Sequence, residues 1–202
     1  MPTRREEILA LAADLFSKNG VQNTSMRDLA DAAGILPSSL YSHFKSKEAL
    51  ADEILREYLE DFRERCRQID EADTSPLDRL RALIRVTLEG ADAFPAALVI
   101  FHRDLNYLAS LPRFDYLFDL YLTIRGIWIR AITDAMDQGQ LRNDVDPNIY
   151  FRWMRDALTM TSRWHEPGGD PTIDALATHA EYVFLRGMIK PPHTPFSTGR
   201  SR

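Results

Sequence analysis

The sequence predicts an all-α protein of about nine helices. Apolar residues recur three and four positions apart, which places them on one side of a helix, and no segment shows the clear alternation of a strand. Capping residues, prolines and glycines separate the periodic segments at short intervals. The chain has 202 residues, of which 45% are hydrophobic and 27% charged. It can therefore bury a sizeable core as one domain or as two.

Three helices are predicted in the first fifty residues. A capping box, in which a Ser or Thr is followed three residues later by an acidic residue, begins at Thr3 and again at Ser25. Gly20 ends the first helix and Gly34 the second. Pro37 then fits the first turn of a third helix. The second and third helices therefore flank a turn that contains a glycine.

A longer helix is predicted from its N-cap, Ser46, to about Asp70, because no Gly or Pro interrupts its apolar face. Three further helices are predicted to begin at Ser75, Asp146 and Asp170, each a capping residue that a proline follows directly. The remaining breaks are expected near Pro95, Pro112, Gly139 and residues 167–169.

Composition excludes several classes of protein. Cys66 is the one cysteine, too few for a disulfide or a zinc site, so a reducing cytoplasm is expected. The first residues lack the apolar run of a signal peptide, and no apolar stretch is long enough to span a membrane. The net charge of −5 lies beyond residue 50, because the first fifty residues are neutral. Nucleic-acid binding there would depend on local clusters, at Arg27 and at Lys45 with Lys47.

The segment from residue 24 to residue 50 has the spacing of a helix-turn-helix. When Met26 is counted as the first position, Ala30 is the fifth, Gly34 the ninth and Leu40 the fifteenth. A small residue lets the helices cross closely, glycine permits a positive φ in the turn, and leucine fills the gap between the helices. Plain helical bundles also contain such turns, so the spacing alone leaves that alternative open.

This segment, TSMRDLADAAGILPSSLYSHFKSKEAL, resembles the DNA-binding domain of TetR-type transcriptional regulators over about thirty residues. The resemblance implies a helix-turn-helix DNA-binding domain at residues 1–46 and a helical effector-binding and dimerisation domain at residues 47–190. It also implies a homodimer. Residues 191–202 show no periodicity and are expected to be a disordered tail. The departures, Leu36 for the usual Ser or Thr and Ser38 for the usual Gly, concern the base sequence that is read.

Roles in DNA binding follow from chemistry at the matching positions. Small hydroxyl side chains on the third helix approach the major groove closely but discriminate bases weakly, so DNA shape is expected to contribute to specificity. Phosphate contacts are expected from the hydroxyl, aromatic, imidazole and ammonium groups that surround the third helix. Arg27 is expected to contact either a phosphate or a base edge. A solvated surface side chain is the alternative for each. The predicted DNA-binding residues are Thr24, Ser25, Arg27, Pro37, Ser38, Ser39, Tyr41, Ser42, His43, Lys45 and Lys47.

Residues 146–163 and 171–189 carry apolar residues on more than one side. A terminal helix pair with two apolar faces suits a dimer interface, the position that the family uses, and a closed intramolecular core is the alternative. A two-fold symmetric dimer predicts an operator of palindromic double-stranded DNA.

The middle of the chain combines many aromatic residues with several arginines. Together these predict a pocket for a large apolar effector that carries carboxylate or phosphate groups. The predicted effector-binding residues are Phe101, Arg103, Tyr107, Tyr121, Arg125, Trp128, Arg163 and Trp164.

Ion pairing is the simpler explanation for any single arginine, since an arginine among apolar helices is costly unless it is paired. The available pairs are Arg103 with Asp104, Arg152 with Asp156, and Arg163 with Glu166.

Two further stretches, LASLPRF at residues 108–114 and SRWHEPGG at residues 162–169, resemble TetR-type repressors of steroid-ring degradation in cholesterol-catabolising actinobacteria. This resemblance implies that an acyl-CoA thioester of a steroid fragment releases the protein from DNA. An aromatic drug or antibiotic is the alternative effector. Occlusion of a promoter makes repression the expected outcome, and the long helix from Lys47 is expected to transmit the effector signal by tilting.

No enzyme motif is present: the sequence lacks G-x-S-x-G, a phosphate loop, G-x-G-x-x-G and H-E-x-x-H. His102 and Asp104 are two residues apart and His165 and Glu166 adjacent, so neither pair shares a helical face. No catalytic residue, cofactor or metal site is therefore expected. A helical interaction module that does not bind DNA is the alternative from another class.

Overall fold

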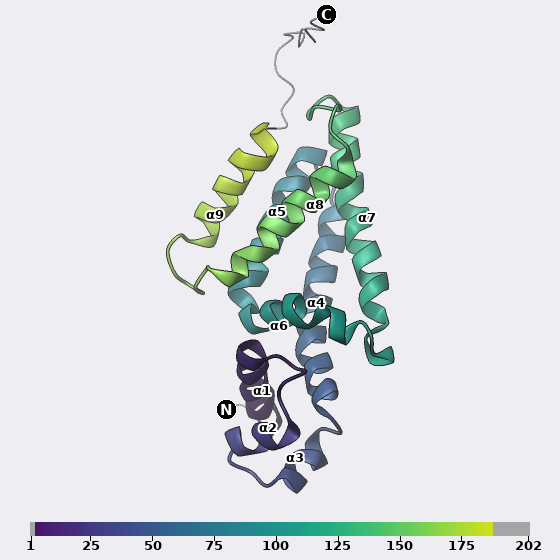
Figure 1. Cartoon of the computed structure of the whole chain (residues 1–202). Coiled ribbons are helices and arrows are strands. Elements are labelled where there is room, and N and C mark those ends of the chain that lie inside the picture. The colour runs from purple at the N-terminus through teal and green to yellow at the C-terminus, as the bar shows by residue number, and fades with distance from the viewer. Residues whose placement is uncertain (1–2, 188–202) are drawn as a thin grey trace, which may run out of the picture.

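A computed structural model describes residues 3–187, and within that range the chain is entirely helical, which confirms the predicted fold class (Figure 1). The expected tail, residues 191–202, lies outside the described range. The elements are α1 (Arg4–Asn19), α2 (Met26–Ala32), α3 (Pro37–His43), α4 (Lys47–Glu71), α5 (Pro76–Ala93), α6 (Pro95–Leu108), η1 (Pro112–Phe114), α7 (Tyr116–Asp137), α8 (Pro147–Thr159), η2 (Met160–Arg163), α9 (Ile173–Ala180) and η3 (Glu181–Arg186).

The helices form an elongated molecule with α1, α2 and α3 at one end (Figure 1). The long helix α4 leads away from that end, and α5, α7 and α8 continue the body of the molecule beside it. The short helix α6 lies crosswise between the first three helices and the rest. This arrangement places α6 in contact with α1 on one side and with α4 and α5 on the other.

Most of the predicted helix starts are confirmed. Both capping boxes form, with the hydroxyls of Thr3 and Ser25 accepting hydrogen bonds from backbone N–H groups three residues later. Ser46, Ser75 and Asp146 cap α4, α5 and α8 in the same way. These short side chains satisfy N–H groups that the first helical turn leaves without a partner.

The predicted helix start at Asp170 is wrong. The helix α9 begins at Ile173, and the hydroxyl of Thr172 accepts a hydrogen bond from the N–H of Ala175. A Thr with extended backbone immediately before the helix supplies the cap, so the Asp-Pro pair belongs to the preceding turn.

The interior divides into two clusters of buried side chains. The first joins α1, α2 and α3 to the first half of α4, to α6 and to the start of α7. The second joins the rest of α4, where Cys66 is buried, to α5, α7, α8 and α9. The predicted boundary between residues 46 and 47 therefore marks the start of a helix but not a gap in packing. The division into two domains stays a prediction.

Glycine substitutions test the close approach of α1 and α6. Gly20 has a φ of +90°, and a Cβ there would lie 3.2 Å from Oδ1 of the buried Asp104. We expect Gly20→Ala to lower the free energy of unfolding by about 1–3 kcal/mol, because Ala rarely adopts this backbone conformation. Urea denaturation followed by circular dichroism measures the change.

Gly126 is the matched control for Gly20. It lies within α7, where a Cβ would meet only the flexible end of Arg130 at 3.4 Å. Gly126→Ala should raise the free energy of unfolding by about 0.5–1 kcal/mol, because a helix interior favours Ala over Gly. Equal effects of the two substitutions would contradict the assignment of strain to Gly20.

Candidate functional site

The helix-turn-helix forms as its spacing predicts. Ala30 and Leu40 are fully buried where α2 and α3 meet, and Gly34 adopts a φ of +62° in the turn. Phe44, which follows α3, is buried against the same core. These contacts fix α3 against α2 and leave its opposite side in solvent.

The exposed side of α3 carries the hydroxyl residues that the sequence assigned to it. Ser38, Ser39 and Ser42 are exposed, and the ring of Tyr41 is 53% exposed. Leu36, the N-cap of α3, is 73% exposed and was not among the predicted contacts. An exposed aliphatic side chain at the start of such a helix has the chemistry to contact a thymine methyl group.

Three of the predicted phosphate ligands also have local structural roles. Thr24 is buried, and its hydroxyl donates to the carbonyl of Gly20 over 2.7 Å. The hydroxyl of Ser25 is engaged with Asp28 in the capping box. Nζ of Lys47 donates to the carbonyl of Gln22 over 2.7 Å. The protein backbone therefore already occupies and covers the hydroxyl of Thr24, and its contact with DNA stays a prediction.

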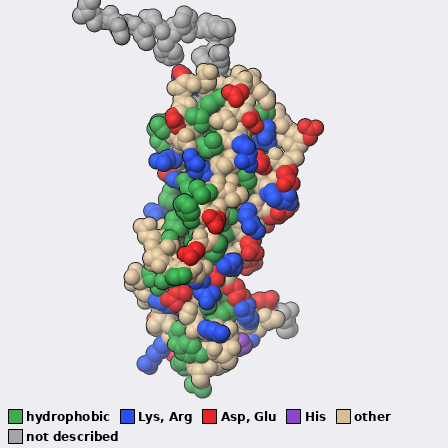
Figure 2. Space-filling model, turned by 90° about the vertical axis from the view of Figure 1, so that its right-hand side faces the viewer, with side chains coloured by type: hydrophobic (Ala, Val, Ile, Leu, Met, Phe, Trp, Pro, Cys, Tyr) green, Lys and Arg blue, Asp and Glu red, His purple; other side chains and the backbone are tan. Residues whose placement is uncertain are grey.

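Other basic groups on this face extend into solvent. The side chain of Arg27 is 84% exposed, with Nε 3.9 Å from Asp31, and Lys45 and His43 are exposed. A hollow of about 380 Å³ separates the loop before α2 from the end of α3, with Tyr41 and Lys45 on its wall. Lys and Arg side chains and a histidine are visible at this end of the molecule (Figure 2). The surface thus offers cations within reach of a duplex backbone.

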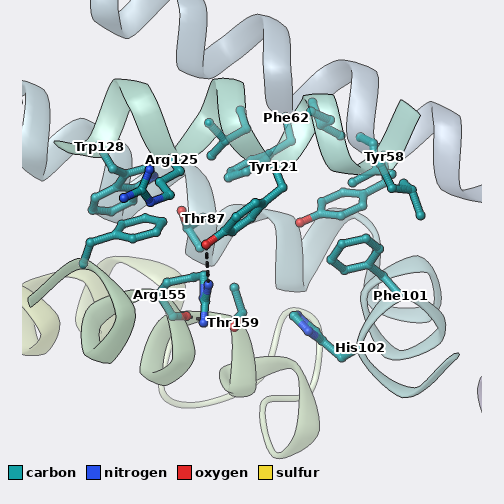
Figure 3. A pocket seen from close by; sticks show the side chains of 15 residues that line it. Tyr58, Phe62, Thr87, Phe101, His102, Tyr121, Arg125, Trp128, Arg155 and Thr159 are labelled. Carbon is teal, nitrogen blue, oxygen red and sulfur yellow. Dashed lines mark hydrogen bonds between the residues drawn. The ribbon is translucent and has the colours of Figure 1, made fainter. Parts of the chain in front are cut away.

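A second site lies in the body of the molecule, where five helices enclose an apolar cavity of about 110 Å³ (Figure 3). The cavity is smaller than the roughly 300–1,000 Å³ of sites that hold drug-sized ligands. A larger ligand would have to push the helices apart. Its walls are formed by Tyr58, Leu59, Phe62, Thr87, Phe101, His102, Leu117, Leu120, Tyr121, Ile124, Arg125, Trp128, Phe151, Arg155 and Thr159.

Four of the eight predicted effector-binding residues line this cavity: Phe101, Tyr121, Arg125 and Trp128. The guanidinium of Arg125 donates to Oδ1 of Asn148, which holds it beside the indole of Trp128 (Figure 3). Aromatic side chains from α6 and α7 therefore do converge, as the sequence predicted.

The other four predicted residues lie outside the cavity, and their role in effector binding stays a prediction. Arg103 and Tyr107 are on the side of α6 that faces α1 and α4. Arg163 and Trp164 are exposed beyond α8, and Trp164 is 60% exposed. Successive residues of a helix point about 100° apart, so nearness in sequence to Phe101 did not place Arg103 in the same cavity.

Several lining residues were missed because their spacing is that of ordinary core. Tyr58 and Phe62 of α4 stack with their ring centroids 5.9 Å apart, and nothing in their helical period separates a cavity wall from a packed interior. Arg155 was missed because Arg152 was assigned to Asp156. The guanidinium of Arg155 instead binds Asp156 over 2.6 Å and donates to the Tyr121 hydroxyl over 3.4 Å.

One of the three predicted arginine ion pairs forms in the structure. Arg103 lies 3.5 Å from Asp104, as predicted. The pairings of Arg152 with Asp156 and of Arg163 with Glu166 do not form between the described residues. Arg152 lies on the exposed side of α8, and Asp156 pairs with Arg155, the residue before it in the chain.

Comparison with known proteins shows which family combines these two sites. Residues 8–54 match the profile described as bacterial regulatory proteins, tetR family, and residues 73–188 match the tetracyclin repressor-like C-terminal domain. The chain belongs to the TetR family. TetR proteins are transcriptional regulators that bind DNA and dimerise.

Relatives within the family match along most of the chain. The HTH-type transcriptional repressor KstR2 of Rhodococcus jostii is 38% identical over 93% of this chain and 92% of its own length. KstR2 of Mycobacterium tuberculosis is 37% identical over 93% and 94%. The solved structure of the ketosteroid transcriptional regulator KstR2 of M. tuberculosis has a TM-score of 0.89 at 36% identity, covering 94% of this chain and 97% of that one. AibR, solved with isovaleryl coenzyme A and operator DNA, shares the fold, with a TM-score of 0.75 at 24% identity over 91% and 99%.

The helix α6 joins the helix-turn-helix to the body of the molecule. Arg103 on α6 donates hydrogen bonds to the carbonyls of Phe16, Ser17 and Lys18 at the end of α1, over 2.9 Å for Ser17 and 3.1 Å for Lys18. A cation at these last carbonyls caps α1 and complements its dipole. On the same helix, the hydroxyl of Tyr107 donates to Glu48 of α4 over 2.9 Å.

The two stretches that resemble steroid-related repressors contain residues that bind carboxylates of α4 and α5. Arg113 of the first stretch lies 3.2 Å from the carboxylate of Asp52, which is buried in α4 and also accepts a hydrogen bond from Tyr116 over 3.1 Å. In the second stretch, Nε2 of His165 lies 3.2 Å from the carboxylate of Asp92 in α5. That carboxylate also accepts a hydrogen bond from the N–H of Gly168 over 2.7 Å.

Residues 3–187 contain neither a metal-binding cluster nor a membrane-spanning helix. No group of three or more His, Cys, Asp or Glu side chains could hold a metal ion there. None of the helices in this range has the length and hydropathy needed to cross a membrane.

The capping role of Ser25 is tested through the charge of Asp28. Hydrogen bonds from the hydroxyl and N–H of Ser25 lower the pKa of the Asp28 carboxyl. A carboxyl with a lowered folded pKa stabilises the protein above its unfolded pKa of about 3.9, and this contribution is lost as pH falls through the folded value. We expect Ser25→Ala to raise the pKa of Asp28 toward about 3.9 in a carboxyl NMR titration.

The N-cap Ser75 at the start of α5 supplies the control for Ser25→Ala. There the hydroxyl of Ser75 lowers the pKa of Asp78. Ser25→Ala should leave the pKa of Asp78 unchanged, and Ser75→Ala should raise the pKa of Asp78 alone. An Asp28 pKa that stays low in Ser25→Ala would contradict the assigned role.

Proposed function

We propose that this protein is a ligand-responsive repressor that binds a palindromic operator as a dimer and leaves it when an effector enters the cavity. One observation supports this above the others: the chain matches the KstR2 repressors over both its helix-turn-helix and its C-terminal helices. Its α3 presents hydroxyl and aromatic side chains to solvent, with Arg27 and Lys45 beside them.

Dimer formation accounts for an apolar surface on the terminal helices. One side of α8 is buried in the core, whereas Ile149 and Trp153 on its other side are 47% and 67% exposed. Tyr182 and Val183 of η3 are 50% and 68% exposed. Exposed apolar side chains gathered on terminal helices are typical of a surface that a partner covers. This favours the interface over the closed intramolecular core.

For the effector we propose a CoA thioester of a steroid fragment. The relatives carry the name of a ketosteroid regulator, and the apolar walls of the cavity suit a saturated ring system. The guanidinium groups of Arg125 and Arg155 reach the lining, where they can bind anionic groups of the ligand. AibR indicates that this fold accommodates a CoA thioester together with DNA. An aromatic drug or antibiotic is the alternative, which the aromatic lining favours.

The small volume of the cavity suggests how binding could reach the DNA. An effector larger than the space must displace the helices around it, including α6, whose Phe101 and His102 line the cavity. The same helix holds α1 through Arg103 and α4 through Tyr107. Movement of α6 would then shift α1 and tilt the start of α4, which changes the separation of the two α3 helices in the dimer.

Exposed cations test the DNA-binding surface. We expect Arg27→Ala and Lys45→Ala each to weaken binding to an operator obtained by selection by about 1 kcal/mol. Each should also reduce the slope of log affinity against log salt by about 0.9, the loss of one phosphate contact. Fluorescence anisotropy at several salt concentrations gives both quantities.

Thr24→Val is the control for the DNA-binding variants. The Thr24 hydroxyl is buried and donates to the Gly20 carbonyl, so its removal should leave the salt slope unchanged. If Arg27→Ala and Tyr41→Ala both bind DNA as the wild type does, the result would favour the alternative function, a helical interaction module that does not bind DNA.

Operator release tests the effector. CoA thioesters of steroid-ring fragments should release the operator at lower concentrations than their free acids, because the acids lack the CoA phosphates. We expect Arg155→Met to raise the half-release concentration roughly tenfold by removing a charge-assisted contact. Arg142→Met, which removes a surface arginine paired with Asp144, should not change it. Release by aromatic antibiotics and by no thioester would support the alternative effector.

A further inference from the structure

The cavity contains a polar atom that its own structure leaves without a partner. Nε2 of His102 is sealed from solvent and has no hydrogen-bond partner among the described residues. Its ring packs edge-on against Phe101, with the centroids 5.5 Å apart, and points into the cavity (Figure 3). A buried polar atom without a partner lowers stability, so its presence in an apolar wall calls for a ligand.

Two hydroxyls around the cavity are already engaged, whereas the phenol of Tyr58 forms no hydrogen bond to another described residue. The hydroxyl of Thr87 donates to the carbonyl of Leu83 over 2.8 Å. The hydroxyl of Thr159 donates to the carbonyl of Arg155 over 2.8 Å. Arg125 donates to Asn148, and it lies at the opposite end of the lining from His102 (Figure 3). His102 and the phenol of Tyr58 are therefore the groups with free hydrogen-bonding capacity at this end of the cavity, and Nε2 of His102 is the one that solvent does not reach.

The surroundings of His102 favour a neutral ring. Burial and the positive charges of Arg163 and Arg155 lower the pKa of His102, although Asp156 opposes this. A neutral imidazole offers one N–H donor and one acceptor. A carboxylate placed here would lose its water for a single neutral donor, which is unfavourable. A ketone or hydroxyl oxygen loses far less and can bond to this nitrogen.

We propose that His102 is a specificity-determining residue whose Nε2 binds a neutral ketone or hydroxyl oxygen on the ring system of the effector. The inference rests on the proposed function in one respect, that this cavity is the effector site. The ring system would lie against Tyr58, Phe62 and Phe101, with its oxygen at His102 and its anionic end toward Arg125. A hydrocarbon ring of the same shape would leave Nε2 unpaired and bind less well.

Two small bicyclic probes test this assignment without knowledge of the effector. 1-Indanone and indane share a carbon skeleton and differ by one ketone oxygen. The quantity measured is the dissociation constant of indane divided by that of 1-indanone, from ligand-observed NMR titrations of the full chain. We expect His102→Phe to lower this ratio about fivefold relative to the wild type, the effect of one net hydrogen bond. His102→Gln, whose amide nitrogen reaches the place of Nε2, should keep the ratio within about twofold.

Thr87→Val is the matched control, because it removes a cavity hydroxyl that is already paired and should leave the ratio unchanged. If His102→Phe does not fold, as judged by circular dichroism, His102→Leu takes its place. In the wild type labelled with ¹⁵N-histidine, 1-indanone should shift the Nε2 resonance of His102 and indane should not.

The same ratio in the wild type and in the apolar variant, or no binding of either probe to the wild type, would overturn the assignment. The proposed effector fails separately. If steroid-fragment thioesters do not release the operator while 1-indanone is still discriminated through His102, then the effector proposal is wrong and the role of His102 stands.

Discussion

The apolar cluster that joins the helix-turn-helix to α6 and to the first half of α4 constrains this molecule more than any other feature. Leu50 and Leu55 of α4 are fully buried in the same cluster as Leu40 of α3 and Ile100 of α6. Protein interiors are packed as densely as organic crystals, so α6 cannot move without moving its neighbours. The end of the molecule that carries α3 is thereby joined rigidly to the helix that lines the cavity.

Polar contacts also join these helices to one another. Arg103 reaches from α6 to three carbonyls at the end of α1, and Asp52 of α4 is buried beside Arg113 and Tyr116. A buried carboxylate that loses its partners is strongly destabilising, so these contacts favour motion of whole helices over local rearrangement. The cavity is small, and the binding of a larger ligand can supply the free energy for such a motion.

Ser, Thr and Arg side chains suit DNA or ligand binding, but they also bind backbone groups at the ends of helices. In this structure several of the predicted binding residues make such backbone contacts. Ser25 and Thr24 resemble phosphate ligands in sequence, yet one caps α2 and the other bonds to the backbone of the preceding turn. Arg103 resembles an effector contact and caps α1. In each case an unpaired backbone group within reach competes for the same side chain, because buried N–H and carbonyl groups must find partners.

The sequence by itself determined the helices, most of their caps, the helix-turn-helix and the family, because these depend on residues close together along the chain. It also indicated an aromatic cavity, of which Phe101 and Trp128 are part. Only the tertiary structure decided that Tyr58 and His102 line that cavity and that Arg103 turns away to residues more than eighty positions earlier. Helical periodicity shows which residues share an apolar side, but the element that packs against that side is fixed by contacts between distant segments.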